Sequence, residues 1–366
     1  MNIFEMNNVR RDSELNSKIT KTSPVVEVFA AMVKGESLDK FGAKADKAVN
    51  YIKELGSRAD NNDPVAISEL NSIRRFVIEA PVVEELNLLG IFGSYENVDY
   101  DTTIEREVYN YADEMSREQA ASGDVPFTML NKVTYPVATF TVSGGIQNDY
   151  RRIQVGDMSR ENQMLTQVQT DILNNAKAKI IKRIYAAINS AQGVKYIFAG
   201  QNGLTKAGAD GVINNVRRNG KPSIVGDYAL LSQFTPWAGY DGNLNSTHFY
   251  GVSDEIINQV AATGLLASYN GAVLAEMSNP YNLFKKNAAG NNFETLLPIG
   301  LGFVIPTGVN SPIATWTRGG LTSFSGNDVK TGKVLTRFDI EVACDIAKGR
   351  EHEIGVLYDE QLGGLN

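Results

Sequence analysis

The feature that most constrains this chain is one helical pattern of unusual length, which begins at Ser159 and ends before Gly193. A helix of about 33 residues is roughly 50 Å long at 1.5 Å per residue, about three times the globular mean. Its apolar residues recur every four positions along one stripe: Val168, Ile172, Ala176, Ile180, Ile184 and Ile188. Because a coiled coil needs a repeat of 3.5 residues, this stripe turns slowly around the helix axis. We therefore expect a strut whose two ends pack against different surfaces.

Composition excludes several classes of protein. The chain has 366 residues, and its 35 Lys and Arg against 42 Asp and Glu give a net charge of −7, which disfavours sequence-specific nucleic-acid binding. One cysteine excludes an internal disulfide and a Cys-rich zinc site, and two histidines leave little for a metal site or a catalytic relay. No apolar run is long enough to span a bilayer, and the polar start of the chain predicts no signal peptide.

Three short amphipathic helices are predicted before the strut. The first 20 or so residues are polar and are expected to form a flexible arm. The helices open at Ser23-Pro24, at Ser37 and at Asp63-Pro64, and the second is expected to end at Gly56. Each needs another surface to bury its apolar stripe.

Residues 104–133 fit two structures equally well. Ile104, Val108, Tyr111 and Met115 follow a helical period, whereas residues 127–140 are rich in β-branched and aromatic side chains that favour strands around a turn at 120–126. The residues alone leave helix and hairpin open. A strand is predicted to follow over 137–142 and to end at Ser143-Gly144-Gly145, with a return strand over 150–155.

After residue 194 the pattern predicts a mixed α+β unit. Strands are expected at 195–198, 223–225, 296–305 and 313–316, with helices at 226–234 and 253–262. Two closing strands, 335–346 and 353–358, are expected to pair as a hairpin around Lys348-Gly349-Arg350.

No catalytic, cofactor-binding or metal site emerges from the motifs. Gly326–Lys333 misses the spacing of a phosphate-binding loop. His352 lies between Glu351 and Glu353, but on a strand those carboxylates would point away from the imidazole. Cys344 falls on the apolar face of its strand and is predicted to be a buried small hydrophobe.

One basic cluster on the long helix has two interpretations. Such a cluster is usually a solvated helix face, but it can also contact phosphates. The residues are Lys177, Lys179, Lys182 and Arg183.

The order of elements resembles the major capsid protein of tailed bacteriophages, the Hong Kong ninety-seven type of capsid fold. Glu107-Val108-Tyr109-Asn110-Tyr111 through Pro126-Phe127 resembles that family's extended loop. Arg151-Arg152-Ile153-Gln154, leading into 159–191, resembles the strand before its spine helix. The stretches 221–227 and 272–281 resemble parts of its axial domain, and 335–340 with 354–358 resemble its closing peripheral strands.

The resemblance implies an α+β phage capsid fold with a definite division of the chain. The N-terminal arm and short helices would occupy 1–60, and the extended loop 104–133. The peripheral domain would comprise 61–103, 134–193 and 330–366, with its spine helix at 160–192. The axial domain would occupy 194–329.

The resemblance also favours a hairpin over 104–133, and a lone two-stranded arm is barely stable in water. Its side chains would therefore find contacts on a neighbouring subunit. The candidate interface residues are Val108, Tyr111, Arg117, Val125 and Phe127.

The implied function is that of a coat subunit that assembles with itself into hexamers and pentamers of an icosahedral head around double-stranded DNA. The protein would be found in the virion after assembly in the host cytoplasm. It would have no cofactor, no membrane contact and no enzymatic activity, but a portal partner and, in some systems, scaffolding or decoration proteins. Two alternatives stay open: an encapsulin-like cellular shell, and an α+β enzyme with its site in 194–329. An adhesin or surface-layer protein is disfavoured.

The positions of the lysines predict that neighbouring subunits are not covalently crosslinked. Some relatives join a loop lysine to an asparagine of a neighbour, but the only lysine between Ile104 and Ala176 is Lys132, away from the turn. We expect mature particles to run as single chains on a denaturing gel. A ladder of higher bands would contradict this.

Overall fold

The computed structural model describes residues 22–34, 36–61, 63–87, 93–111, 118, 123, 127, 129–148, 159–237, 258, 260, 262–287, 290–307, 311–328 and 333–362. Several predictions lie outside these residues. They are the arm at 1–21, the turn at 120–126 apart from Gly123, the strand at 150–155 and most of the helix at 253–262.

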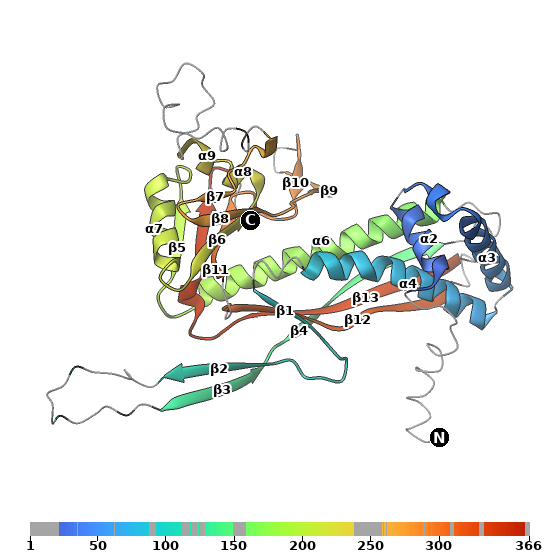
Figure 1. Ribbon diagram of the computed structural model, residues 1–366, viewed down its shortest axis with the longest axis horizontal. Coiled ribbons are helices and arrows are strands. Elements are labelled where there is room, and N and C mark those ends of the chain that lie inside the picture. The colour runs from blue at the N-terminus through green and yellow to red at the C-terminus, as the bar shows by residue number, and fades with distance from the viewer. Residues whose placement is uncertain are drawn as a thin grey trace, which may run out of the picture.

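The predicted strut is present as helix α6, Ser159–Ser190. It lies along one face of a sheet that, among the described residues, has four strands in the order β1-β12-β13-β4 (Figure 1). β1 runs parallel to β12, and the other neighbours are antiparallel. The strands are β1 (Ser94–Val98), β12 (Ile313–Asp328), β13 (Lys333–Ile346) and β4 (Thr139–Asn148).

The main core lies between α6 and this sheet. Every residue of the predicted apolar stripe on α6 is buried, and so are Phe338, Ile340 and Val342 on the facing side of β13. Burial of each large aliphatic side chain contributes about 1.5–3 kcal/mol. The opposite ends of α6 meet different partners. It contacts α2 (Pro24–Val33) and α4 (Pro64–Asn87) as well as β4, β13 and the turn η4 (Glu351–Glu353). The expectation drawn from the turning stripe is confirmed.

The N-terminal helices pack beside α6, but their bounds differ from the prediction. Ser23 precedes α2 with Pro24 at its first position, as expected. The helix predicted from Ser37 is two elements, because Gly42 adopts φ +50° between them, a conformation that favours glycine. The next helix then continues through Gly56 rather than ending there. The elements are α2 (Pro24–Val33), η1 (Leu38–Phe41), α3 (Ala43–Asp60) and α4 (Pro64–Asn87), the last much longer than expected.

The second part of the fold is built on a sheet of six described strands, in the order β5-β14-β11-β6-β8-β7 (Figure 1). These are β5 (Tyr196–Gly200), β14 (Gly355–Asp359), β11 (Leu301–Thr307), β6 (Lys221–Gly226), β8 (Ala272–Glu276) and β7 (Ser268–Tyr269). The other elements are α7 (Lys206–Val216), α8 (Tyr228–Leu231), α9 (Phe234–Trp237) and a separate hairpin of β9 (Tyr281–Lys286) and β10 (Phe293–Thr295).

Two predictions about the closing strands are wrong. β13 and β14 do not form a hairpin, because each belongs to a different sheet. Between them the chain turns through η4, which is held by a bidentate ion pair of 2.6 Å from Arg350 to Glu353. His352 therefore lies on a 3-10 turn and not on a strand.

The same topology joins strands across the predicted division of the chain. Residues 313–328, placed in the axial unit, pair with β13, and residues 355–359, placed in the peripheral unit, pair with β5 and β11. β14 is buried along its whole length, which suits the continuous apolar run of an inner strand.

Cys344 is buried as predicted, and burial raises the pKa of its thiol to about 12. The thiol stays protonated near neutral pH and is a poor nucleophile there. Among the described helices, none is both long and apolar enough to cross a membrane.

Strand β4 continues through Ser143-Gly144-Gly145, where the sequence predicted its end. A side chain at Gly144 would lie 2.9 Å from Cγ1 of Val168 and 3.0 Å from Cδ1 of Ile172, both on α6. The glycine therefore permits close packing between helix and strand. At Gly145 the nearest atom, the carbonyl oxygen of Thr336, would lie at an ordinary 3.6 Å.

We predict that Gly144→Ala lowers the free energy of unfolding by about 1–3 kcal/mol, because the added methyl overpacks the contact with α6. Chemical denaturation of the unassembled chain measures the change. Gly145→Ala is the matched control and should stay within about 0.5 kcal/mol of the parent. Equal effects of the two substitutions would contradict the packing argument.

Candidate functional site: the projecting arm

The region that the residues left open is a β-hairpin. β2 (Glu105–Tyr111) and β3 (Leu130–Pro136) pair antiparallel from Glu105↔Pro136 to Tyr111↔Leu130. Within the described part of the chain this ribbon pairs with no further strand, and it projects from the body as an arm (Figure 1). The hairpin implied by the resemblance is confirmed.

The register assigns the arm two faces, because directly opposed residues point the same way. One face carries Tyr109 with Lys132, followed by Leu130 opposite Tyr111. On that face the ammonium of Lys132 lies 2.5 Å from Glu107, which lowers the pKa of the Glu107 carboxyl through its hydrogen bond and charge. Both side chains are about half exposed, so the pair contributes little to stability.

The outer part of the arm exposes large apolar side chains to solvent. Phe127 is 92% exposed, and the exposure of such a large apolar side chain to water is unfavourable. The other exposed members of the group are Tyr109, Met129 and Leu130, together with Val133, which pairs with Val108 and so lies on the other face of the ribbon. We call these five residues the arm's apolar surface.

The predicted interface residues meet different outcomes. Phe127 belongs to the apolar surface. Val108 does not, because it is only 4% exposed within its own chain: it shares the face of β2 that carries Arg106 and meets the body. Tyr111 is placed by its backbone pairing with Leu130, while Arg117 and Val125 lie outside the described residues.

Sequence reasoning missed Tyr109, Met129, Leu130 and Val133. The β-branched and aromatic side chains of 127–140 indicated a strand, but they could not say which residues face outward until the register was known. The link from 112 to 129 is too long for turn chemistry to fix that register.

Arg106 anchors the arm to the body. Its guanidinium is buried and donates to two backbone carbonyls, 2.8 Å to Asp345 and 2.7 Å to Pro312. It also lies 3.9 Å from the Asp345 carboxylate and 5.9 Å from the ring centroid of Trp316. Burial lowers the pKa of Arg106, and the Asp345 charge opposes that shift. One side chain thus ties β2 to the neighbourhood of β12 and β13.

Tyr135, directly opposite Arg106 on β3, completes the polar root. Its hydroxyl donates 2.7 Å to Asp345 Oδ2 and accepts 3.2 Å from the Lys348 backbone N–H. Burial, followed by the hydrogen bond to Asp345, raises the pKa of Tyr135 to about 12. The hydroxyl therefore stays protonated, and remains a donor, throughout the neutral range.

An apolar patch supports these bonds beneath the root. Ile104 is buried against Ala314, Trp316 and Ala343, with Val137 packed at the edge. These residues lie on the sheet face opposite α6, so the helix and the arm root cover opposite sides of the same sheet (Figure 1). The root is held by these contacts, whereas the described part of the chain leaves the apolar surface beyond it exposed.

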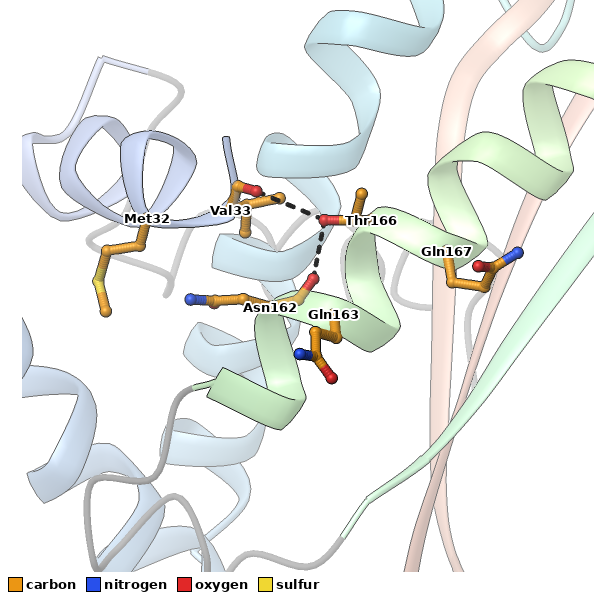
Figure 2. A pocket seen from close by; sticks show the side chains of 6 residues that line it. All are labelled: Met32, Val33, Asn162, Gln163, Thr166 and Gln167. Carbon is orange, nitrogen blue, oxygen red and sulfur yellow. Dashed lines mark hydrogen bonds between the residues drawn. The ribbon is translucent and has the colours of Figure 1, made fainter. Parts of the chain in front are cut away.

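The chain also has an open hollow between α2 and the start of α6. Figure 2 shows its lining, in which Thr166 donates 2.9 Å to the carbonyl of Asn162 and reaches the Val33 carbonyl at 3.5 Å. The other lining residues are Met32, Gln163 and Gln167. The lining thus supplies amides, a hydroxyl and apolar groups. Among the described residues, no cluster of three or more His, Cys, Asp or Glu could hold a metal ion.

Comparison with known families decides what kind of protein carries this arm. Residues 5–358 match the family described as "SPbeta prophage-derived putative capsid protein YonB". The chain belongs to this family. It is a phage capsid protein with a mixed helix and strand fold, as the resemblance implied. The prophage origin of the family disfavours the encapsulin-like alternative.

Several solved structures match the chain at low sequence identity. A structure of Mycobacterium phage Adephagia is 13% identical, with 72% of this chain and 87% of that one covered and a TM-score of 0.45. The mature capsid of bacteriophage PhiM1 is 12% identical, covers 73% and 85%, and has a TM-score of 0.43. A virus-like particle from Pyrococcus furiosus is 9% identical, covers 76% and 97%, and has a TM-score of 0.42. At such scores they add nothing to the family assignment. A search of the curated proteins finds no match.

We predict that Arg106→Met in this YonB-family chain lowers the free energy of unfolding by about 1.5–3 kcal/mol, because two charge-assisted hydrogen bonds at the root are lost. It should also speed proteolysis within 105–136. Arg337→Met is the control, since Arg337 is exposed and its ion pair with Asp339 is worth about 0–1 kcal/mol. Unchanged proteolysis of the arm in Arg106→Met would contradict an anchoring role.

Proposed function

We propose that this chain builds an icosahedral phage head as hexamers and pentamers of itself, and that the arm of each copy lies on a neighbouring copy. The observation that supports this is the contrast within the arm. Its root is fixed by buried hydrogen bonds at Arg106 and Tyr135, yet the apolar surface beyond is exposed. A two-stranded ribbon without a third partner is poorly stable in water, so a covering surface is expected.

The proposal assigns the two sheets to different parts of the subunit. The four-stranded sheet with α6 and the N-terminal helices would form the peripheral part, and the six-stranded sheet with α7 the axial part. This keeps the division predicted from the resemblance but exchanges β12 and β14 between the parts. Ring closure then needs the arm of one copy to meet a different surface of the next, as in any heterologous interface.

The assembled shell is proposed to enclose double-stranded DNA in the virion, after assembly in the host cytoplasm. A portal complex would admit the DNA, and scaffolding or decoration proteins would be optional partners. The family is one of structural proteins, and we propose no enzymatic activity for the chain.

We predict that Phe127→Ser with Leu130→Ser abolishes shells without unfolding the subunit. Both side chains are exposed, so the free energy of unfolding should change by no more than about 0.5 kcal/mol. Negative-stain images and size-exclusion chromatography of the purified chain measure assembly. Val65→Ser is a control in which an exposed apolar residue on α4 is lost instead.

Normal shells from the double variant would show that the arm's apolar surface isn't a subunit contact. If the parent chain itself formed no shells, and remained a monomer at high concentration, the proposed function would fail as a whole.

A further inference from the structure

The long helix ends in a stretch of chain with an unusual charge pattern. Between residues 172 and 209 there are six Lys and Arg and no Asp or Glu, although the whole chain has a net charge of −7. Strand β4, beside this half of α6, has no charged residue at all. Positive charge is therefore concentrated on one part of an acidic protein.

The structure gathers three of these cations on one side of α6. Lys179 and Lys182 are exposed, and residues three apart on a helix are neighbours. Arg183 donates 2.9 Å to the Ala138 carbonyl, and its guanidinium lies 4.3 Å from the ring centroid of Phe140. The Lys179 ammonium lies 5.6 Å from the same centroid. We call Lys179, Lys182 and Arg183 the α6 basic stripe.

The stripe and the arm root belong to opposite sides of the four-stranded sheet. α6 covers one face of that sheet, while Ile104 and Trp316 mark the root on the other (Figure 1). In a shell one subunit thick, a sheet lying along the wall has one face towards the contents and the other towards the outside. A helix on the inner face would present its basic stripe to whatever the shell holds.

We infer that the α6 basic stripe contacts the phosphates of the enclosed nucleic acid. This inference rests on the proposed function, because it needs α6 to face a DNA-filled lumen. The contact is purely electrostatic: exposed ammonium groups at the stripe replace counterions along the backbone and read no sequence. Weak binding of this kind lets the cargo slide, which packaging into a closed container requires.

The contact has a measurable signature in its dependence on salt. Each phosphate neutralised on B-form DNA contributes about 0.9 to the slope of log affinity against log salt concentration. Removing two lysine charges should therefore reduce that slope by up to about 1.8 and weaken binding most at low salt. An acidic surface on a second copy is the competing partner, and charge removal would then change assembly instead.

The test compares two double variants of the full chain with matched geometry. Lys179→Gln with Lys182→Gln removes the exposed charges of the stripe, and Arg183 is kept because it bonds to Ala138. The control, Lys44→Gln with Lys47→Gln, removes two exposed lysines with the same spacing on α3. Fluorescence anisotropy with a labelled DNA duplex of about 30 base pairs gives affinity and salt slope for each.

We expect the stripe variant to bind at least about tenfold more weakly than the parent at low salt, with a smaller slope, while the control matches the parent. If both variants lost DNA affinity equally, the change in net charge alone would explain the loss, and the inference would be overturned. An unchanged affinity in the stripe variant would overturn it too.

Negative-stain images of the same samples separate this inference from the proposed function. If the stripe variant forms shells but binds DNA more weakly, the result supports both the proposed function and the inference. If the stripe variant alone loses the ability to form shells, the stripe is a subunit contact and the inference fails. If the parent forms no shells, the proposed function fails, whatever the DNA affinities are.

Discussion

A two-stranded ribbon has no core of its own, and this constraint governs the rest of the molecule. The arm must be held at one end by its own body and covered at the other by something else. Arg106 and Tyr135 both hydrogen-bond to Asp345 and so hold the inner end of the arm. Ile104 and Trp316 pack beneath these bonds. Nothing within the described part of the chain covers the outer end. The body therefore holds the root of the hairpin and leaves its outer part to be covered by another molecule.

The part of the subunit that carries the arm is stabilised by the contact between α6 and the four-stranded sheet. A helix of this length would fray in isolation, but its turning stripe is buried over its length. Gly144 lets β4 come close to α6 where the sequence pattern suggested that the strand ends. Because α6 covers one face of the four-stranded sheet, the arm root packs on the opposite face. The two sides of the subunit therefore differ chemically.

Sequence reasoning worked where one element dictates its own pattern. The stripe from Val168 to Ile188 predicted a long helix with different partners at its two ends, and the alternation around Cys344 predicted a buried strand face. It failed for α7, since Gly208 and Gly211 weaken the helical signal, although Thr205 caps it. At the arm it offered two interface candidates of opposite character: Phe127 is exposed, whereas Val108 is buried within its own chain.

The sequence by itself determined the long amphipathic helix, the buried strand face around Cys344, and the excess of positive charge between residues 172 and 209. Only the tertiary structure decided which strands share a sheet. β13 and β14 are adjacent in the chain, yet they belong to different sheets. The tertiary structure also decided which side chains of the arm are exposed. Both depend on pairing between distant segments, whose register no local pattern encodes, and a shift of one residue would exchange buried for exposed.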